Sequence, residues 1–151
     1  MGANCRGAIG LCQSTSLVTL LPSMLKSGYI ITRRWYLDSL ELAHLLVDTI
    51  IDKKGSNVVL LDIHEQAVFA DYFLICNGEN VRQLHALAEG IAEDAKHKAD
   101  VLPLGVEGDA QSGWILLDFG DLVVHLFAPE KRAYYNLEDL WRDAHPVLRM
   151  Q

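Results

Sequence analysis

Apolar residues recur at helical spacing in two long segments of this chain. Between residues 38 and 53 they lie three or four positions apart, which is typical of a helix with one buried face. Asp38 can begin this helix in a capping-box pattern, and Gly55 ends it. A second stripe runs through residues 81–98, and Asn80 is placed to cap that helix. The pattern therefore predicts two amphipathic helices.

Four other segments have patterns typical of strands. Residues 57–63 are rich in β-branched side chains and leucine, which favours a strand buried on both faces. Residues 70–77 form a second apolar run. Residues 114–119 and 122–127 are adjacent strands joined by a tight turn, and alternation sorts each into two faces.

Shorter elements complete the predicted order. Residues 101–106 are extended, and Pro103 marks a sheet edge. Pro129 opens a short helix and Asn136 can cap another, whereas Pro146 ends regular structure before a fraying tail. Tyr134, Tyr135 and Trp141 lie on these closing helices and are interpreted as covering the sheet edge. We therefore expect an α/β (α+β) fold, with a mixed sheet of four to five strands and helices packed on it.

The charge divides the chain into a leader and a body. Of the 13 basic residues, four lie in residues 1–37, which contain no acid, so the rest of the chain holds nine basic and 20 acidic residues, a net charge of −11. We expect one domain at residues 38–142 and a tail at residues 143–151. The leader fits an organellar transit peptide or an extension without a role, and both interpretations stay open.

An acidic body excludes some partners and favours others. Direct nucleic-acid binding depends on lysine and arginine, so sequence-specific binding is not expected. A basic protein is a better partner, because opposite fields favour encounter. The apolar run in the leader is too short to span a bilayer, so no membrane partner is expected. The three cysteines lack zinc spacing, so no metal and no cofactor is expected.

The predicted strand at residues 114–119 has an unusual face. Trp114, Leu116 and Asp118 point to one side of it, which is neither a plain core face nor a plain solvent face. Large aromatic residues beside a charge are typical of protein-binding surfaces. The pattern favours an outward-facing Trp114 on a binding surface.

Carboxylates at strand ends leave an enzymatic alternative open. Asp62, Asp71 and Asp118 lie at such ends, where acidic residues can hold Mg²⁺. That alternative is a metal-dependent nucleotidyltransferase or phosphohydrolase. No glycine-rich phosphate loop accompanies these residues, so solvated turns explain them better. His125 has no nucleophile beside it in the sequence pattern and is interpreted as structural.

Several blocks of the body also resemble a known family in its order and spacing. They are DYFLICNG (71–78), VRQLHALAEGIAE (81–93), PLGVEG (103–108), GWILLDFGDLVVHLF (113–127) and RAYYNLEDLW (132–141). On these residues the chain resembles the ribosomal silencing factor family, also called the Iojap family. The resemblance implies a nucleotidyltransferase-like fold without the catalytic residues, and so not an enzyme.

The resemblance also implies a partner and a mechanism. It implies binding to the large ribosomal subunit through ribosomal protein L14 on the subunit-joining face. A protein bound there blocks the small subunit and so represses translation. A homodimer of the free protein, with the tryptophan face hidden, remains compatible with this mechanism. The bacterial pattern implies the cytoplasm, whereas the basic leader keeps mitochondrion and plastid open.

The expected binding residues follow from the strand pattern and the resemblance together. Trp114 matches a family tryptophan on the binding face, with Leu116 and Asp118 beside it, and a family block falls on Glu107. The expected partner-binding set consists of a contact and an acidic rim. These residues are Trp114, Leu116 and Asp118 for the contact, and Glu107, Asp121 and Asp71 for the rim.

Overall fold

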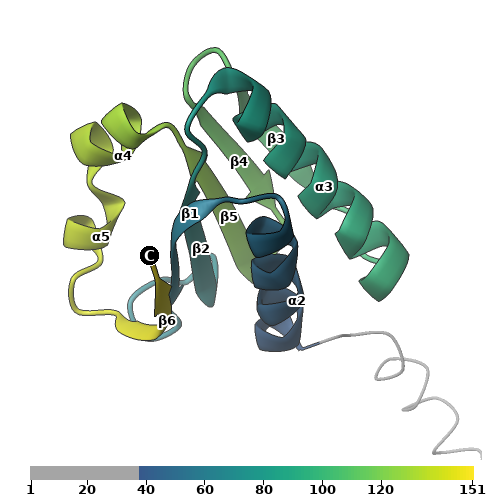
Figure 1. Ribbon diagram of the computed structural model, residues 1–151. Helices are drawn as coiled ribbons and strands as arrows, with labels where there is room; N and C mark the ends of the chain where they lie inside the picture. The colour runs from purple at the N-terminus through teal and green to yellow at the C-terminus, as the bar shows by residue number, and fades with distance from the viewer. Residues whose placement is uncertain (1–37) are drawn as a thin grey trace, which may run out of the picture. The chain divides into compact units, whose positions relative to one another are not determined.

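The computed structural model describes residues 38–151, which fold around a six-stranded sheet with helices on both faces (Figure 1). The order of the strands in the sheet is β3-β4-β5-β2-β1-β6. β2 and β5 pair in parallel, and the other neighbouring strands pair antiparallel. The strands are β1 Ser56–Asp62, β2 Tyr72–Asn77, β3 Gly105–Asp109, β4 Trp114–Asp118, β5 Leu122–Phe127 and β6 His145–Met150. The mixed sheet confirms the expected α/β (α+β) class.

Two long helices cover the first face of the sheet. They are α2 (Ser39–Asp52) and α3 (Val81–Ala99), and both lie on the same side of the strands in Figure 1. Their apolar stripes meet the sheet in one buried cluster that includes Leu46, Leu87 and Leu74. Within residues 38–151, no helix has the length and apolar character of a membrane span.

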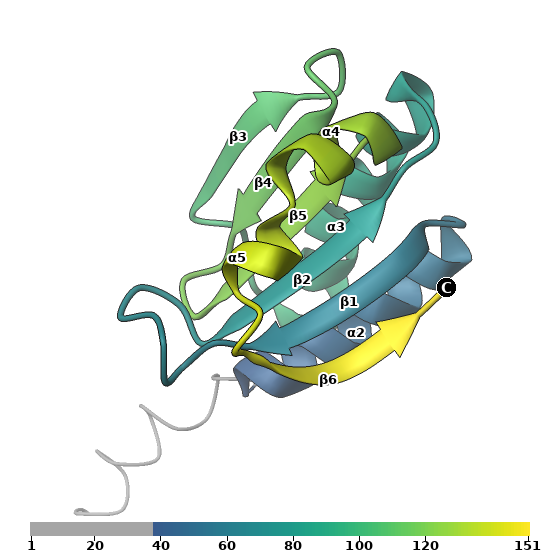
Figure 2. The same ribbon diagram turned by 90° about the vertical axis from the view of Figure 1, so that its left-hand side faces the viewer.

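Two short helices lie over the second face, on the opposite side from α2 and α3 (Figure 2). They are α4 (Pro129–Tyr135) and α5 (Leu137–Leu140), and neither contains a fully buried residue. The strand residues on this face of the sheet form a second buried cluster, which includes Val59, Phe73 and Phe127. This layer therefore contributes fewer buried contacts than α2 and α3.

The last strand differs from the sequence expectation. β6 pairs with the outer edge of β1, with Leu60 opposite Leu148, so the sheet has six strands and the expectation of four to five is wrong. A fraying tail after Pro146 is also wrong. Five of the six residues of β6 are exposed, and its pairing rests on backbone hydrogen bonds. Val147, Leu148 and Met150 of β6 are too few to form the long apolar run that marks a buried strand in the sequence.

The helix ends test the predicted caps. Asn80 caps α3 as expected, because its side-chain oxygen accepts a hydrogen bond from the Gln83 amide at 2.9 Å. Asp38 precedes α2 without a side-chain cap, and Asn136 has a left-handed backbone without one, so both predicted caps are wrong. The leader expected at residues 1–37 lies outside the described residues.

Candidate functional site

Strand register brings four of the predicted binding residues onto one part of the second face. Glu107 of β3 lies beside Leu116 of β4, which in turn lies beside His125 of β5. One row along, Asp118 of β4 lies beside Val123 of β5. Trp114 follows on the same face, because residues two apart on a strand share a face. The structure therefore brings Trp114, Leu116, Asp118 and Glu107 together.

Trp114 is partly buried and held by aromatic neighbours. Its ring stacks on Phe127 with centroids 5.0 Å apart and packs against Tyr135 at 4.7 Å. Its indole N–H donates to Nδ1 of His125 at 3.4 Å. The ring is thus neither sealed in the core nor free in solvent. Since its orientation is already fixed, little side-chain entropy would be lost when a partner binds it.

His125 is a buried residue that supports Trp114. It is 5% exposed, and burial lowers its pKa to about 4, so its imidazole is neutral at neutral pH. Because Nδ1 accepts from Trp114, the ring proton lies on Nε2, which has no hydrogen-bond partner within residues 38–151. This arrangement agrees with the structural role that the sequence suggests for His125.

Two cavities lie beside Trp114 and Leu116. The first, here the Trp141 cavity, has a volume of about 400 Å³ and carries Asp118 and His125 in its lining. The second, here the Lys131 cavity, has a volume of about 280 Å³. Trp114, Leu116 and Glu107 line both cavities. These three residues therefore form a common wall with a hollow on each side.

Two aromatic residues near these cavities are placed differently from the sequence expectation. Tyr135 and Trp141 are expected to cover the sheet edge, but both pack on the second face. Tyr135 lies against Trp114, and Trp141 meets the edge of Phe73 with ring centroids 5.5 Å apart. Sequence reasoning also misses Phe73 as a cavity residue. Phe73 lies in the continuous apolar run of β2, where nothing distinguishes it from its buried neighbours, and the partner that reveals its role, Trp141, is 68 residues away.

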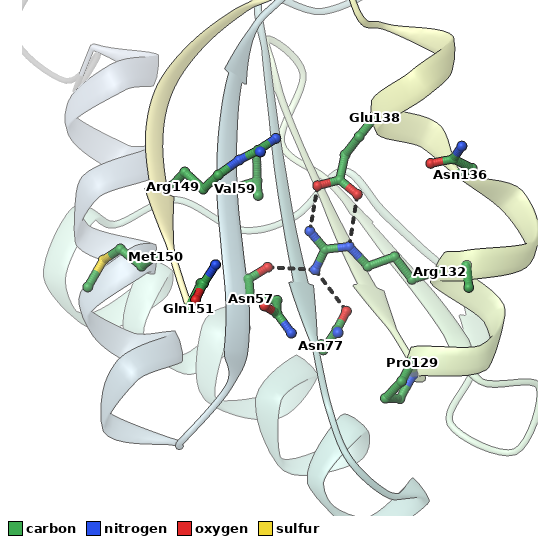
Figure 3. Close-up of a pocket in the computed structure, with 11 residues that line it drawn as sticks. Asn57, Val59, Asn77, Pro129, Arg132, Asn136, Glu138, Arg149, Met150 and Gln151 are labelled. Carbon is green, nitrogen blue, oxygen red and sulfur yellow. Dashed lines mark hydrogen bonds and ion pairs between the residues drawn. The ribbon is translucent and has the colours of Figure 1, made fainter.

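Arg132 attaches the α4–α5 segment to the sheet (Figure 3). Its guanidinium donates from Nε and Nη2 to the carboxylate of Glu138, at 3.1 and 2.8 Å. Nη1 donates to the backbone carbonyl of Asn57 on β1 and to Oδ1 of Asn77 on β2. α4 and α5 bury no residue fully, so this network adds to an attachment that otherwise rests on partly buried side chains such as Leu137 and on Tyr135. The same segment supplies Tyr135, which lines the Lys131 cavity next to Trp114.

Loss of the Arg132 network should destabilise the fold. The Arg132 side chain is only 11% exposed, so Arg132→Met would leave Glu138 and Asn77 without their donor. We expect the free energy of unfolding to fall by about 2–3 kcal/mol, because partly buried polar groups would lose their partners. Urea unfolding measures this change. Arg142→Met, at an exposed position, is the control and should change stability by less than about 0.5 kcal/mol. Equal losses in the two variants would contradict the role of Arg132.

The pH dependence of stability should report the same ion pair. The hydrogen bonds from Arg132 lower the pKa of Glu138 in the folded state. A lowered pKa stabilises the fold above the ordinary glutamate pKa, and this contribution is lost as the pH falls through the folded-state value. Glu138→Gln should therefore be less stable than the wild type by about 1–2 kcal/mol at pH 7, with the gap closing towards pH 3. A gap that stays constant across that range would contradict the assignment.

Asp71 and Asp121 lie apart from this site. The backbone carbonyl of Asp121 accepts hydrogen bonds from the amides of Asp71 and Tyr72, at the start of β2. The Asp121 carboxylate accepts a hydrogen bond from Ser39 at 3.4 Å. Neither aspartate lines the Trp141 cavity or the Lys131 cavity. The two residues join an acidic rim only if a partner reaches that end of the sheet.

The strand-end carboxylates do not converge in the part of the chain that the structure describes. There, no three histidine, cysteine, aspartate or glutamate side chains are grouped to hold a metal ion. The Asp62 carboxylate instead pairs with the ring of His64, and Asp118 accepts the Gly120 amide at 2.7 Å. The metal-dependent alternative therefore gains no support from their arrangement.

Comparison with known proteins agrees with the fold and the sequence blocks. A protein of Halalkalibacterium halodurans named ribosomal silencing factor is 42% identical over 107 residues, covering 71% of this chain and 91% of that protein. A chloroplastic Iojap protein of Arabidopsis thaliana is 32% identical over 111 residues, covering 73% of this chain and 45% of that protein. A crystal structure of a Chromobacterium violaceum protein is 32% identical with a TM-score of 0.66, covering 70% of this chain and 87% of that one.

The model of one protein family matches most of the chain. Its description is ribosomal silencing factor during starvation, and it matches residues 36–151. The match includes every strand of the sheet and the whole surface around Trp114. Members of this family are silencing factors of the ribosome and are not known enzymes. The chain belongs to the ribosomal silencing factor family.

Proposed function

We propose that this chain binds ribosomal protein L14 of the large ribosomal subunit and thereby blocks joining of the small subunit. Membership of the family supports a ribosome-associated silencing role. One observation carries the finer proposal. Trp114, Leu116, Asp118 and Glu107 form a partly exposed surface on the face of the sheet that α2 and α3 leave free.

The composition of this surface suits a protein partner. A tryptophan in a fixed orientation beside a leucine supplies apolar contact area and loses little side-chain entropy on binding. In protein interfaces a few residues of this kind supply most of the binding energy. Carboxylates at its margin steer the encounter towards a basic surface. Residues 38–151, which carry this surface, hold nine basic and 20 acidic residues, so the electrostatic potential around the surface is also negative.

The proposed contact has a centre and a rim. Trp114, Leu116 and Asp118 form the centre, and Glu107 borders it from β3. Asp71 and Asp121 would extend the acidic rim towards the start of β2 and β5. A partner that covers all of these residues needs a footprint wider than the two cavities. A folded ribosomal protein offers such a footprint, whereas a single extended peptide in one cavity does not.

Sedimentation with purified ribosomal subunits tests the proposal directly. The full chain should pellet with large subunits alone, and at saturating amounts it should lower the yield of joined ribosomes when small subunits are added. Failure to pellet would overturn the binding proposal. Pelleting without any change in the yield of joined ribosomes would overturn the block of subunit joining. A crosslink from position 114 that identifies a protein other than L14 would overturn the choice of partner.

A further inference from the structure

We propose that the Trp141 cavity receives one arginine side chain of the basic partner. Its guanidinium would lie between the carboxylates of Glu107 and Asp118, and its methylene stem would lie against the aromatic lining. The identity of the partner rests on the proposed function, whereas the chemistry of the cavity is open to a test without ribosomes.

The charge of the lining selects a cation. Glu107 and Asp118 both line the Trp141 cavity, and no lysine or arginine of the described part of the chain does. His125 adds no positive charge, because burial keeps its imidazole neutral by lowering its pKa. The formal charge of the lining is therefore −2, from these two carboxylates alone. In the Lys131 cavity, by contrast, the lining holds Lys131 as well as Glu107. Of the two hollows beside Trp114, the Trp141 cavity is the one whose negative charge lacks a counter-ion.

The carboxylates are available to a ligand. Neither Glu107 nor Asp118 makes an ion pair within residues 38–151. Asp118 uses Oδ1 to accept the Gly120 amide, which fixes the side chain and leaves Oδ2 for a ligand. An apolar side chain in the cavity would remove water from these oxygens without replacing its hydrogen bonds, which is costly. A donor group offsets that cost.

The remaining lining favours the planar guanidinium over a compact ammonium. Phe73 and Trp141 meet edge to face, and the Phe69 ring, 64% exposed, stands at the rim 6.2 Å from Trp141. Guanidinium stacks on such rings and is more weakly hydrated than an ammonium. It also presents paired N–H donors that match carboxylates, so one group can satisfy both Glu107 and Asp118.

Nuclear magnetic resonance of the full chain tests this inference with a small probe. The probe is N-acetyl-arginine N-methylamide, and the signals are the indole N–H groups of Trp114 and Trp141. We expect both signals to shift saturably. The corresponding lysine and norleucine compounds should bind less tightly. The double variant Glu107→Gln with Asp118→Asn should lower the affinity for the arginine probe by about tenfold, because two charge-assisted hydrogen bonds are lost. The amide oxygen introduced at position 118 can still accept the Gly120 amide, so the turn is kept.

A control variant separates the cavity from general charge. Glu93→Gln removes an exposed carboxylate from α3, on the opposite face of the sheet, and should leave probe binding unchanged. Equal or tighter binding of the lysine or norleucine compound would overturn the choice of arginine. An unchanged affinity in the double variant would overturn the role of the carboxylates. If the probe binds as expected but the chain does not pellet with large subunits, the proposed function fails and the cavity inference stands. If the chain pellets but the probe does not bind, the cavity inference alone is overturned.

Discussion

Replacing Trp114 with alanine should lower the affinity of the chain for the large ribosomal subunit by about thirtyfold or more, which corresponds to about 2 kcal/mol. The indole belongs to the wall shared by both cavities, and three neighbouring rings already hold it in place. Truncation would therefore remove apolar contact area and merge the two hollows. Co-sedimentation over a concentration series measures the change.

Two further variants separate binding from folding in this test. Trp114→Ala also removes the stack on Phe127, so its unfolding free energy must be measured beside its affinity. Trp114→Phe keeps an aromatic ring in that stack while losing the indole area and its N–H, and it should bind more weakly than wild type while staying folded. Tyr134→Ala is the matched control, since Tyr134 is 79% exposed and lines neither cavity. Wild-type affinity in both Trp114 variants would contradict the proposed contact.

Replacing Gly108 with alanine should destabilise the fold by about 2–4 kcal/mol. Gly108 of β3 has φ +77°, in the left-handed region that favours glycine. A Cβ at this position would lie 2.2 Å from the backbone carbonyl oxygen of Trp114, and a backbone atom cannot move aside as a flexible side chain can. The β3–β4 pairing beside Glu107 would have to shift. Chemical unfolding measures the loss, and sedimentation should show weaker binding as well.

The same strand offers a matched control for Gly108. Gly105, three residues earlier in β3, has open space where alanine would add its Cβ, with no atom within 4 Å, so Gly105→Ala should change stability by less than about 0.5 kcal/mol. If Gly108→Ala costs as little stability as Gly105→Ala, the close approach of Gly108 to the Trp114 carbonyl does not restrict this position to glycine.

Local patterns predict several parts of this protein well. Alternation places Trp114, Leu116 and Asp118 on one face of β4, and the strand register shows that Glu107 joins them from β3. The continuous apolar run at β1 is buried on both faces, as its composition predicts. The Asn80 cap also follows from residue type and spacing alone. In each case the cause lies within a few residues of the effect.

Features that depend on distant residues are predicted less well. The edge strand β6 has mostly exposed side chains and only a short apolar run, so its pairing with β1 is not evident from the sequence. Arg132 has the pattern of an ordinary helix residue, yet it binds Glu138 and the two strands β1 and β2. Trp141 is interpreted as a cover for the sheet edge until the fold places it against Phe73.

Neighbouring residues were enough to establish most of the helices and strands, the two faces of β4 and the acidic character of the body, because periodicity and charge are local properties of a chain. The surroundings of Trp114 emerged only from the folded arrangement. The parallel pairing of β2 with β5 brings Phe73 next to Val123, and the return of α4 and α5 adds Tyr135 and Trp141. The cavities exist because segments far apart in the chain meet there, and no local pattern encodes such a meeting.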